Sequence, residues 1–186
     1  MLEQEYEDDS LNCPCIVLLG DRKVGKTSLY KRFFEKKFLE ELEATIVEDK
    51  YENVVEVEHT SKKIHILDTS GEYINDEGVL SYWIERGNCF ILVYSIDEEE
   101  TLHYLKLVYD LIKKNKKAKV PIFFVGNKCD LEKKVSQEDV KKLFGKNISL
   151  FETSAKDDIN VDQAFNDIFR KLFKTKCKRC LCCCCC

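Results

Sequence analysis

Residues 20–27 read Gly-Asp-Arg-Lys-Val-Gly-Lys-Thr and match the phosphate-binding pattern G-x-x-x-x-G-K-[ST]. In such a loop the backbone curls so that several N–H groups point at phosphate oxygens, the lysine adds a positive charge, and the threonine hydroxyl can bind Mg²⁺. The loop follows an apolar run, residues 15–19, and precedes a segment with helical spacing whose N-terminus also attracts anions. This context argues against a turn without a ligand. We predict a nucleoside triphosphate site made by Gly20, Asp21, Arg22, Lys23, Val24, Gly25, Lys26, Thr27 and Ser28.

A second motif narrows the nucleotide to guanine. Residues 127–130, Asn-Lys-Cys-Asp, follow another apolar run, and a carboxylate there can accept hydrogen bonds from both the N1–H and the exocyclic amine of guanine. Adenine offers neither donor, so it would leave the carboxylate unpaired. Four residues alone would equally suit an ordinary loop, but residues 152–156 follow a short strand pattern and could supply a backbone N–H to the guanine oxygen. The predicted base site contains Asn127, Lys128, Asp130, Ser154, Ala155 and Lys156.

The elements that must position these loops alternate between strand and helix patterns, which predicts an α/β fold of the P-loop NTPase type. We expect a six-stranded, mostly parallel sheet flanked by about five helices. The expected strands are 15–19, 54–58, 64–67, 89–94, 122–125 and 149–151. The expected helices are 26–34, 79–84, 98–114, 136–143 and 161–173, the fourth opening with a capping-box pattern at Ser136 and Asp139.

Composition fits one such domain. The chain has 186 residues, 44% of them hydrophobic and 34% charged, so it can bury a sizeable core. The net charge of −4 predicts no nucleic-acid partner. We divide the chain into an acidic, disordered head (1–12), a nucleotide-binding domain (13–173) and a basic, cysteine-rich tail (174–186).

From Cys15 to about Phe173 the chain resembles the Ras-like small GTPases, and within that superfamily it is most similar to the Ras family. The family's phosphate loop matches residues 20–27, its switch I threonine matches Thr45, and its Asp-x-x-Gly motif matches residues 68–71. Its two guanine motifs match residues 127–130 and 154–156.

The resemblance implies a monomer that binds GTP or GDP with Mg²⁺. It implies that Thr27 and Thr45 ligate the metal, that Asp68 holds it through water, and that the Gly71 N–H senses the γ-phosphate. Phe38 would pack edge-on against the guanine; a plain core aromatic is the alternative. The implied partners are effectors, which bind through switch I and switch II, an exchange factor and a GTPase activator.

Glu72 departs from the family pattern at the position that follows the Asp-x-x-Gly glycine. Most relatives carry a glutamine there, which orients the attacking water. An ionised carboxylate offers only acceptors and would repel an anionic phosphate. If Glu72 instead points to solvent, the water simply lacks a positioning group. Both interpretations predict slow hydrolysis; a third is that Glu72 is protonated or acts as a general base.

Arg22 is a second departure, because much of the family has a small residue at this place in the phosphate loop. Its side chain could obstruct the transition state and an activator's arginine finger, or it could fold onto the phosphates as a finger in cis. An arginine turned out to water is the third possibility. The residues expected to act on the γ-phosphate are Glu72, Arg22, Lys26 and Thr45.

Switch I differs in two further ways. Residues 45–51 contain one residue more than the Ras effector segment, yet they keep acidic side chains that could dock a basic strand. A solvated acidic loop is the alternative interpretation. Leu42 stands where the family usually has a tyrosine that closes over the nucleotide.

The cysteines form two groups. Cys13, Cys15, Cys89 and Cys129 lie in or beside apolar segments and are expected to act as small hydrophobic residues. The tail combines cysteines with basic residues, which indicates lipidation rather than disulfides or zinc and predicts anchoring by two signals. The last four residues fit a C-a-a-X box poorly, so a terminal Cys-Cys prenylation signal and multiple palmitoylation both stay open. The candidate sites are Cys177, Cys180, Cys182, Cys183, Cys185 and Cys186.

No apolar signal sequence or membrane-spanning run is seen, so we expect the protein at the cytoplasmic face of the plasma membrane or an endomembrane. The function predicted from sequence is a membrane-anchored GTP/GDP switch in signal transduction with slow intrinsic hydrolysis. The alternative is a GTP-loaded pseudo-GTPase or membrane scaffold without meaningful turnover.

Overall fold

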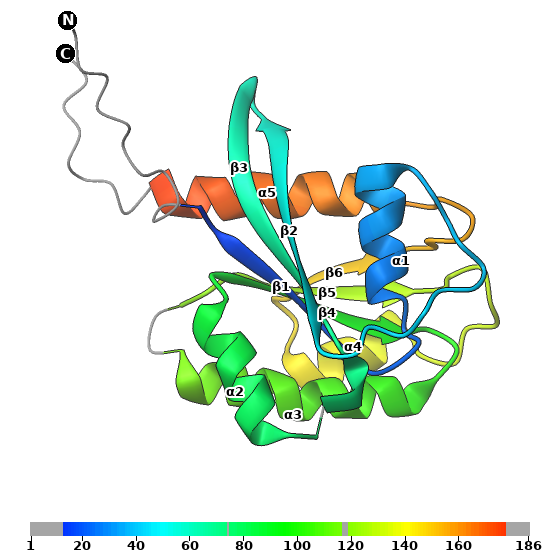
Figure 1. Ribbon diagram of the computed structural model, residues 1–186. Helices are drawn as coiled ribbons and strands as arrows, with labels where there is room; N and C mark the ends of the chain where they lie inside the picture. The colour runs from blue at the N-terminus through cyan, green and yellow to red at the C-terminus, as the bar shows by residue number, and fades with distance from the viewer. Residues whose placement is uncertain (1–12, 74, 117–118, 178–186) are drawn as a thin grey trace, which may run out of the picture.

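A single six-stranded sheet organises the computed structural model, which describes residues 13–73, 75–116 and 119–177 (Figure 1). The strand order is β2-β3-β1-β4-β5-β6. The strands are β1 (Cys15–Leu19), β2 (Glu48–Val57), β3 (Thr60–Thr69), β4 (Cys89–Ser95), β5 (Ile122–Asn127) and β6 (Ser149–Glu152). All neighbouring pairs are parallel except β2 and β3, so the predicted mostly parallel sheet is confirmed.

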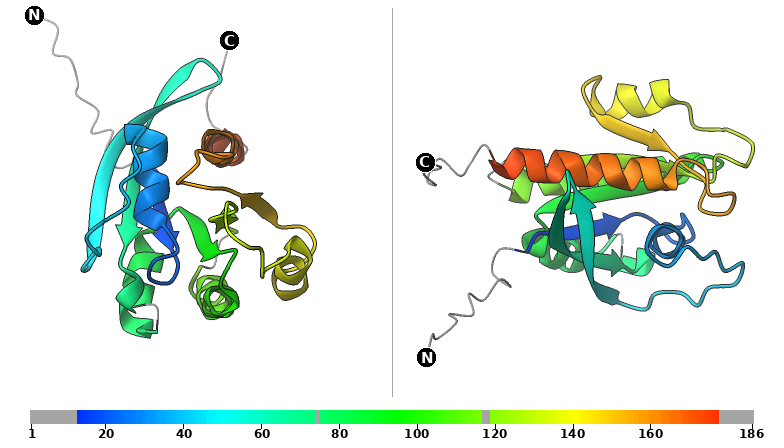
Figure 2. Two further views of the ribbon diagram at one scale, coloured as in Figure 1. Left: turned by 90° about the vertical axis from the view of Figure 1, so that its right-hand side faces the viewer. Right: turned by 90° about the horizontal axis from the view of Figure 1, so that it is seen from above.

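Helices cover both faces of the sheet, as expected for buried parallel strands. They are α1 (Lys26–Tyr30), α2 (Glu77–Arg86), α3 (Glu99–Asn115), α4 (Gln137–Phe144) and α5 (Val161–Cys177). The side chains of α1 and α5 share one core cluster with one face of the sheet, and those of α2, α3 and α4 share a second cluster with the other face. Figure 2 shows this division from two further directions. The carboxyl ends of β1, β4 and β5 therefore open at one edge between the two helical layers.

Several helix ends follow directly from local sequence. Ser136 and Asp139 form the predicted capping box at the start of α4, with the Ser136 hydroxyl accepting from the Asp139 N–H and the Asp139 carboxylate accepting from the Ser136 N–H. Asp76 caps α2 by accepting from the backbone N–H groups of Gly78 and Val79. The helix predicted at 26–34 continues past Tyr30 as a π-helical turn, Lys31–Glu35.

Several elements are longer than the sequence pattern predicted, among them β3, which begins at Thr60 rather than Ile64. β2 begins at Glu48 rather than Val54, because its charged first half pairs along β3 at an exposed sheet edge where apolar alternation is not required. The helix α5 runs to Cys177, so it continues into the segment predicted as tail. The candidate lipidation sites Cys180, Cys182, Cys183, Cys185 and Cys186, and the side chain of Cys177, lie outside the described residues, as does the predicted acidic head.

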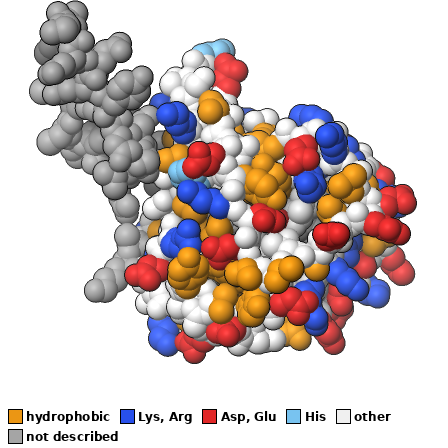
Figure 3. Space-filling view, in the orientation of Figure 1, with side chains coloured by type: hydrophobic (Ala, Val, Ile, Leu, Met, Phe, Trp, Pro, Cys, Tyr) orange, Lys and Arg blue, Asp and Glu red, His pale blue; other side chains and the backbone are white. Residues whose placement is uncertain are grey.

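The described surface mixes charges of both signs, with acidic side chains along the right-hand edge of Figure 3, where the loop after α1 runs in Figure 1. Three exposed glutamates of that loop are Glu40, Glu41 and Glu43. Among the described helices, none combines the length and apolar character needed to cross a membrane.

Candidate functional site

An open cavity of about 1020 Å³ lies at the carboxyl edge of the sheet, where ligands of doubly wound α/β folds bind. Of the residues predicted for the nucleotide site, most line this cavity: Asp21, Arg22, Lys23, Gly25, Lys26, Thr27, Ser28, Phe38, Thr45, Gly71, Glu72, Asn127, Lys128, Asp130, Ala155 and Lys156. Gly20, Val24, Asp68 and Ser154 do not line it and are buried. The start of α3 adds Glu98, Glu100 and Tyr104 to the wall, which the sequence motifs gave no reason to include.

The phosphate-binding loop has the curled backbone that its pattern predicts. Gly25 has φ +97°, and a Cβ at this position would lie 2.2 Å from the Asn127 Nδ2. A Cβ on Gly20 would lie 2.2 Å from the Val93 carbonyl oxygen. Both positions therefore require glycine, one for its backbone conformation and both for space.

Lys26 lies inside the curl of this loop. Its Nζ donates to the carbonyl oxygens of Gly20 and Asp21, each at 2.8 Å, and the residue is only 7% exposed. Burial lowers the pKa of Lys26 to about 8, although the charge of Asp68 works in the opposite direction. The loop thus holds a poorly solvated ammonium group that an anionic phosphate would stabilise.

Three oxygen-bearing side chains gather beside Lys26. The Thr27 hydroxyl donates to Asp68 Oδ2 at 2.6 Å and lies 3.2 Å from the Thr45 hydroxyl. Asp68 is completely buried, and its Oδ1 has no hydrogen-bond partner among the described residues. Burial raises the pKa of Asp68 to about 6, against the lowering effects of Thr27 and Lys26.

This donor set suits Mg²⁺, which prefers oxygen ligands and is commonly held by one carboxylate, side-chain hydroxyls, waters and the substrate phosphates. The orphaned Asp68 oxygen is the observation that fits, because a buried carboxylate normally finds a partner. Within the part of the chain that the structure describes, no cluster of three or more His, Cys, Asp or Glu residues offers a protein-only metal cage.

Asn127 ties the base loops to the phosphate loop. Its amide donates to the Val24 carbonyl oxygen at 2.9 Å and accepts from the Ala155 N–H at 3.1 Å. The residue is 2% exposed, so its main contribution is to hold three loops together. Asp130, which is half-buried, lines the cavity nearby, and its contact with a base stays a prediction.

Arg32 is a site residue that sequence reasoning missed. Its guanidinium donates to the carbonyl oxygens of Ala155 and Lys156 at 2.7 and 2.8 Å, and it lies 5.7 Å from the centre of the Phe38 ring. A single arginine in a helical stretch carries no sequence signal for such a contact. Phe38 itself is partly buried, packs against the core and also lines the cavity, so its packing against a guanine stays a prediction.

Arg22 and Glu72, the two departures from the family pattern, pair with each other. Arg22 Nη1 lies 3.3 Å from Glu72 Oε1 and 3.4 Å from Oε2, with the side chains 63% and 50% exposed. The sequence interpretations placed each side chain on the phosphates or in water and did not consider this pair. The backbones are also close, because a Cβ on Gly71 would lie 2.3 Å from the Arg22 nitrogen.

The acidic segment after Thr45 is a strand edge and not a solvated loop. Glu48, which starts β2, accepts hydrogen bonds from the Trp83 indole and from Arg86 Nη1, both on α2. The Ser70 N–H donates to the Val47 carbonyl oxygen at 2.8 Å. The two segments that would respond to a nucleotide, one around Thr45 and one around Gly71, are thus joined directly by this hydrogen bond. Leu42 lines the cavity, and unlike the tyrosine usual in the family it has no phenolic hydroxyl.

The comparisons with known proteins agree with this geometry. Residues 15–174 match the model of the Ras family. The chain is 38% identical over 161 residues to Ras-related protein Rab-13 of Mesocricetus auratus, covering 84% of this chain and 78% of that protein. It is 37% identical over 169 residues to Rab-13 of Rattus norvegicus, covering 88% and 82%. It is 33% identical over 167 residues to Ras-like protein rasU of Dictyostelium discoideum, covering 87% and 76%.

Proposed function

Because the chain belongs to the Ras family of small GTPases, we propose that it is a membrane-anchored GTP/GDP switch in signal transduction whose intrinsic hydrolysis is slow. Members of this family bind GTP, GDP and Mg²⁺, hydrolyse GTP, and interact with effectors, exchange factors and activators. The observation that carries the proposal of slow hydrolysis is the Arg22–Glu72 pair beside the phosphate loop.

Each predicted residue has a role that follows from its position. Lys26 and the curled backbone of residues 20–27 bind the phosphates. Thr27, Thr45 and Asp68 would hold Mg²⁺, which neutralises charge on the transferred phosphoryl group when it is bound. Asp130 would accept hydrogen bonds from the guanine base, and Gly71, whose backbone lies close to that of Arg22, would sense the γ-phosphate with its N–H.

The pair weakens hydrolysis in two ways. Glu72 cannot donate a hydrogen bond to phosphate while it accepts one from water, as a glutamine could. The contact of Arg22 with Glu72 supports a guanidinium held away from the phosphates rather than one acting as a finger in cis. An exposed ion pair of this kind contributes little to folding stability. Its role is therefore tested by the rate of GTP hydrolysis.

We predict that Glu72→Gln raises the single-turnover rate of GTP hydrolysis by about tenfold, because the amide supplies the missing donor. Arg22→Gly should leave the rate low, because Glu72 then faces the phosphate without its partner. The measurement uses full-length protein loaded with GTP and Mg²⁺. The matched control is Glu77→Gln, which removes an exposed carboxylate paired with Lys114 outside the cavity.

Two outcomes would contradict this proposal. If the wild-type protein hydrolyses GTP at an ordinary intrinsic rate and Arg22→Gly slows it, Arg22 acts as a finger in cis. If neither variant turns over and the purified protein carries GTP, the chain is the GTP-loaded binding module that forms the alternative.

Two observations support membrane anchoring. The tail combines cysteines with basic residues, and Ras-family relatives are in general associated with membranes. We propose that lipid on the tail cysteines and the charges of residues 174–179 act together at the cytoplasmic face of a membrane. A single lipid chain binds marginally, and each basic side chain adds about 1 kcal/mol at an anionic surface.

Replacing the seven cysteines between 177 and 186 by serine should therefore move the expressed protein from the membrane fraction to the soluble fraction. Neutralising Lys176, Lys178 and Arg179 should cause a partial shift of the same kind. The measurement is fractionation of cells that express full-length protein, with Cys13→Ser as the control. Unchanged membrane association of the serine variant would refute anchoring by the tail cysteines.

A further inference from the structure

The loop that joins β4 to α3 is held rigidly against the base site. The Ser95 N–H donates to the Thr101 hydroxyl at 3.0 Å, and that hydroxyl donates to the Glu98 carbonyl oxygen at 2.7 Å. The Ile96 N–H donates to the Asn127 carbonyl oxygen at 3.0 Å. Because both ends of the loop are fixed, the one side chain between them, Asp97, starts from a defined position.

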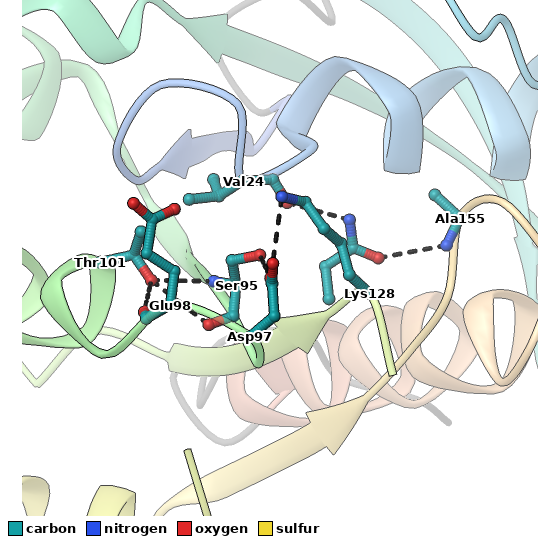
Figure 4. Close-up of polar contacts among 8 residues, drawn as sticks. Val24, Ser95, Asp97, Glu98, Thr101, Lys128 and Ala155 are labelled. Carbon is teal, nitrogen blue, oxygen red and sulfur yellow. Dashed lines mark hydrogen bonds and ion pairs between the residues drawn. The ribbon is translucent and has the colours of Figure 1, made fainter. Parts of the chain in front are cut away.

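The Asp97 carboxylate is fixed in turn by Ser95, which is completely buried. The Ser95 hydroxyl donates to Asp97 Oδ1 at 2.5 Å (Figure 4). Burial alone would raise the pKa of Asp97, but the hydrogen bond from Ser95 and the charges of Lys128 and Lys134 outweigh it, so the pKa is lowered. Asp97 is therefore a permanent negative charge at neutral pH.

Lys128 is the group that this charge meets. Its Nζ lies 3.8 Å from Asp97 Oδ1, and both side chains are 29% exposed. The Lys128 backbone has φ +64° between the buried Asn127 and Cys129, whose N–H donates to the Thr153 carbonyl oxygen. With the backbone fixed on both sides, only the flexible lysine stem remains to be oriented.

The two residues differ in their relation to the cavity. Lys128 lines it beside Asp130, whereas Asp97 does not. A lysine side chain covers apolar surface with its stem while its charge stays solvated or paired. The pairing with Asp97 draws the ammonium group to the loop and so fixes the stem where it forms part of the cavity wall.

We propose that Asp97 is a positioning residue that holds Lys128 in place as a wall of the guanine site and thereby slows nucleotide release. This inference rests on the proposed binding of guanine nucleotides in the cavity. It assigns no chemistry to Asp97 itself, because the carboxylate acts only through Lys128.

The test is the dissociation rate of a fluorescent GDP analogue from full-length protein in Mg²⁺. Asp97→Asn keeps an oxygen that accepts from the Ser95 hydroxyl but removes the charge that pairs with Lys128. We expect release to become about fivefold faster, which corresponds to about 1 kcal/mol. The matched control is Asp110→Asn, which breaks an exposed lysine pair on α3 outside the cavity and should leave release unchanged.

A double-mutant cycle separates positioning from a structural effect. If Asp97 acts through Lys128, Asp97→Asn has no further effect on release in a Lys128→Met background, and its effect in the wild-type background shrinks at high salt. Equal effects in both backgrounds, or no effect in either, would overturn the inference. A wild-type protein that does not bind the analogue at all would overturn the proposed function and this inference with it.

Discussion

Asp130→Ala is expected to weaken the binding of GDP by about a thousandfold or more while the fold is retained. A site built to hydrogen-bond two donors on a base loses most of its affinity when the acceptor is removed. The two donors are then taken out of water and gain no hydrogen-bond partner in the protein. Asp130 is half-buried and lines the cavity, so its side chain is not part of either core cluster. The measurement is equilibrium binding of GDP with the thermal unfolding temperature as a check on folding.

The amide variant gives this prediction a second readout. Xanthine has an N1–H donor and a carbonyl oxygen where guanine has its exocyclic amine, so Asp130→Asn should lose guanine nucleotides and bind the xanthine nucleotide better than the wild type does. Asp157→Asn, an exposed change in the neighbouring base loop, is the matched control. Wild-type affinity for GDP in Asp130→Ala would show that another group reads the base.

The parts of the fold that the sequence predicted are those in which one short segment determines its own structure. The run 15–19 became β1 at the predicted residues, because a buried parallel strand needs only a continuous apolar stretch between punctuating residues. The capping box at Ser136 was equally local. The first half of β2 was missed, since the pairing of Glu48 and Asp49 along β3 depends on the partner strand rather than on their own polarity.

The candidate site divides in the same way. The phosphate loop was predictable, because its pattern and the hydrogen bonds of Lys26 to the Gly20 and Asp21 carbonyl oxygens lie within eight residues. The Arg22–Glu72 pair was not, although both residues were singled out, because it joins side chains 50 positions apart whose partners depend on the folded backbone. The contact of Arg32 with the loop at 155–156 spans 123 positions and was missed for the same reason.

The burial of the charges on Lys26 and Asp68 lowers the folding stability of the protein without its ligands. Burial disfavours the charged form of each, lowering the pKa of Lys26 to about 8 and raising that of Asp68 to about 6. For a lysine with a lowered pKa the unfolded chain binds more protons, so stability rises as the pH increases from about 8 toward the ordinary lysine pKa of 10.5. A phosphate and Mg²⁺ would remove both penalties, which links folding stability to ligand binding.

Lys26→Met should therefore abolish most nucleotide binding, by about a thousandfold, without unfolding the protein. The variant removes a desolvated charge along with its two hydrogen bonds to backbone oxygens, and it removes the cation that neutralises the phosphates. Lys26→Arg should not restore binding, because a planar guanidinium does not fit where a single Nζ contacts Gly20 and Asp21 at 2.8 Å. The measurement is the affinity for GDP with Mg²⁺, and Lys114→Met, which removes an exposed lysine of α3 outside the cavity, is the control.

The pH dependence of the wild type tests the same charge without a substitution. Phosphate contact favours the ammonium form, so Lys26 should have a higher pKa in the complex than its value of about 8 in the empty protein. Affinity should then be level between about pH 7 and 8, above the pKa of Asp68, and fall as the pH rises to about 9, because the free protein must take up a proton to bind. The titration ends at about pH 9, because guanine loses its own N1–H at higher pH. An affinity that stays level across this range would mean that Lys26 is fully charged in the empty loop. The desolvation of Lys26 would then not contribute to the affinity for phosphate.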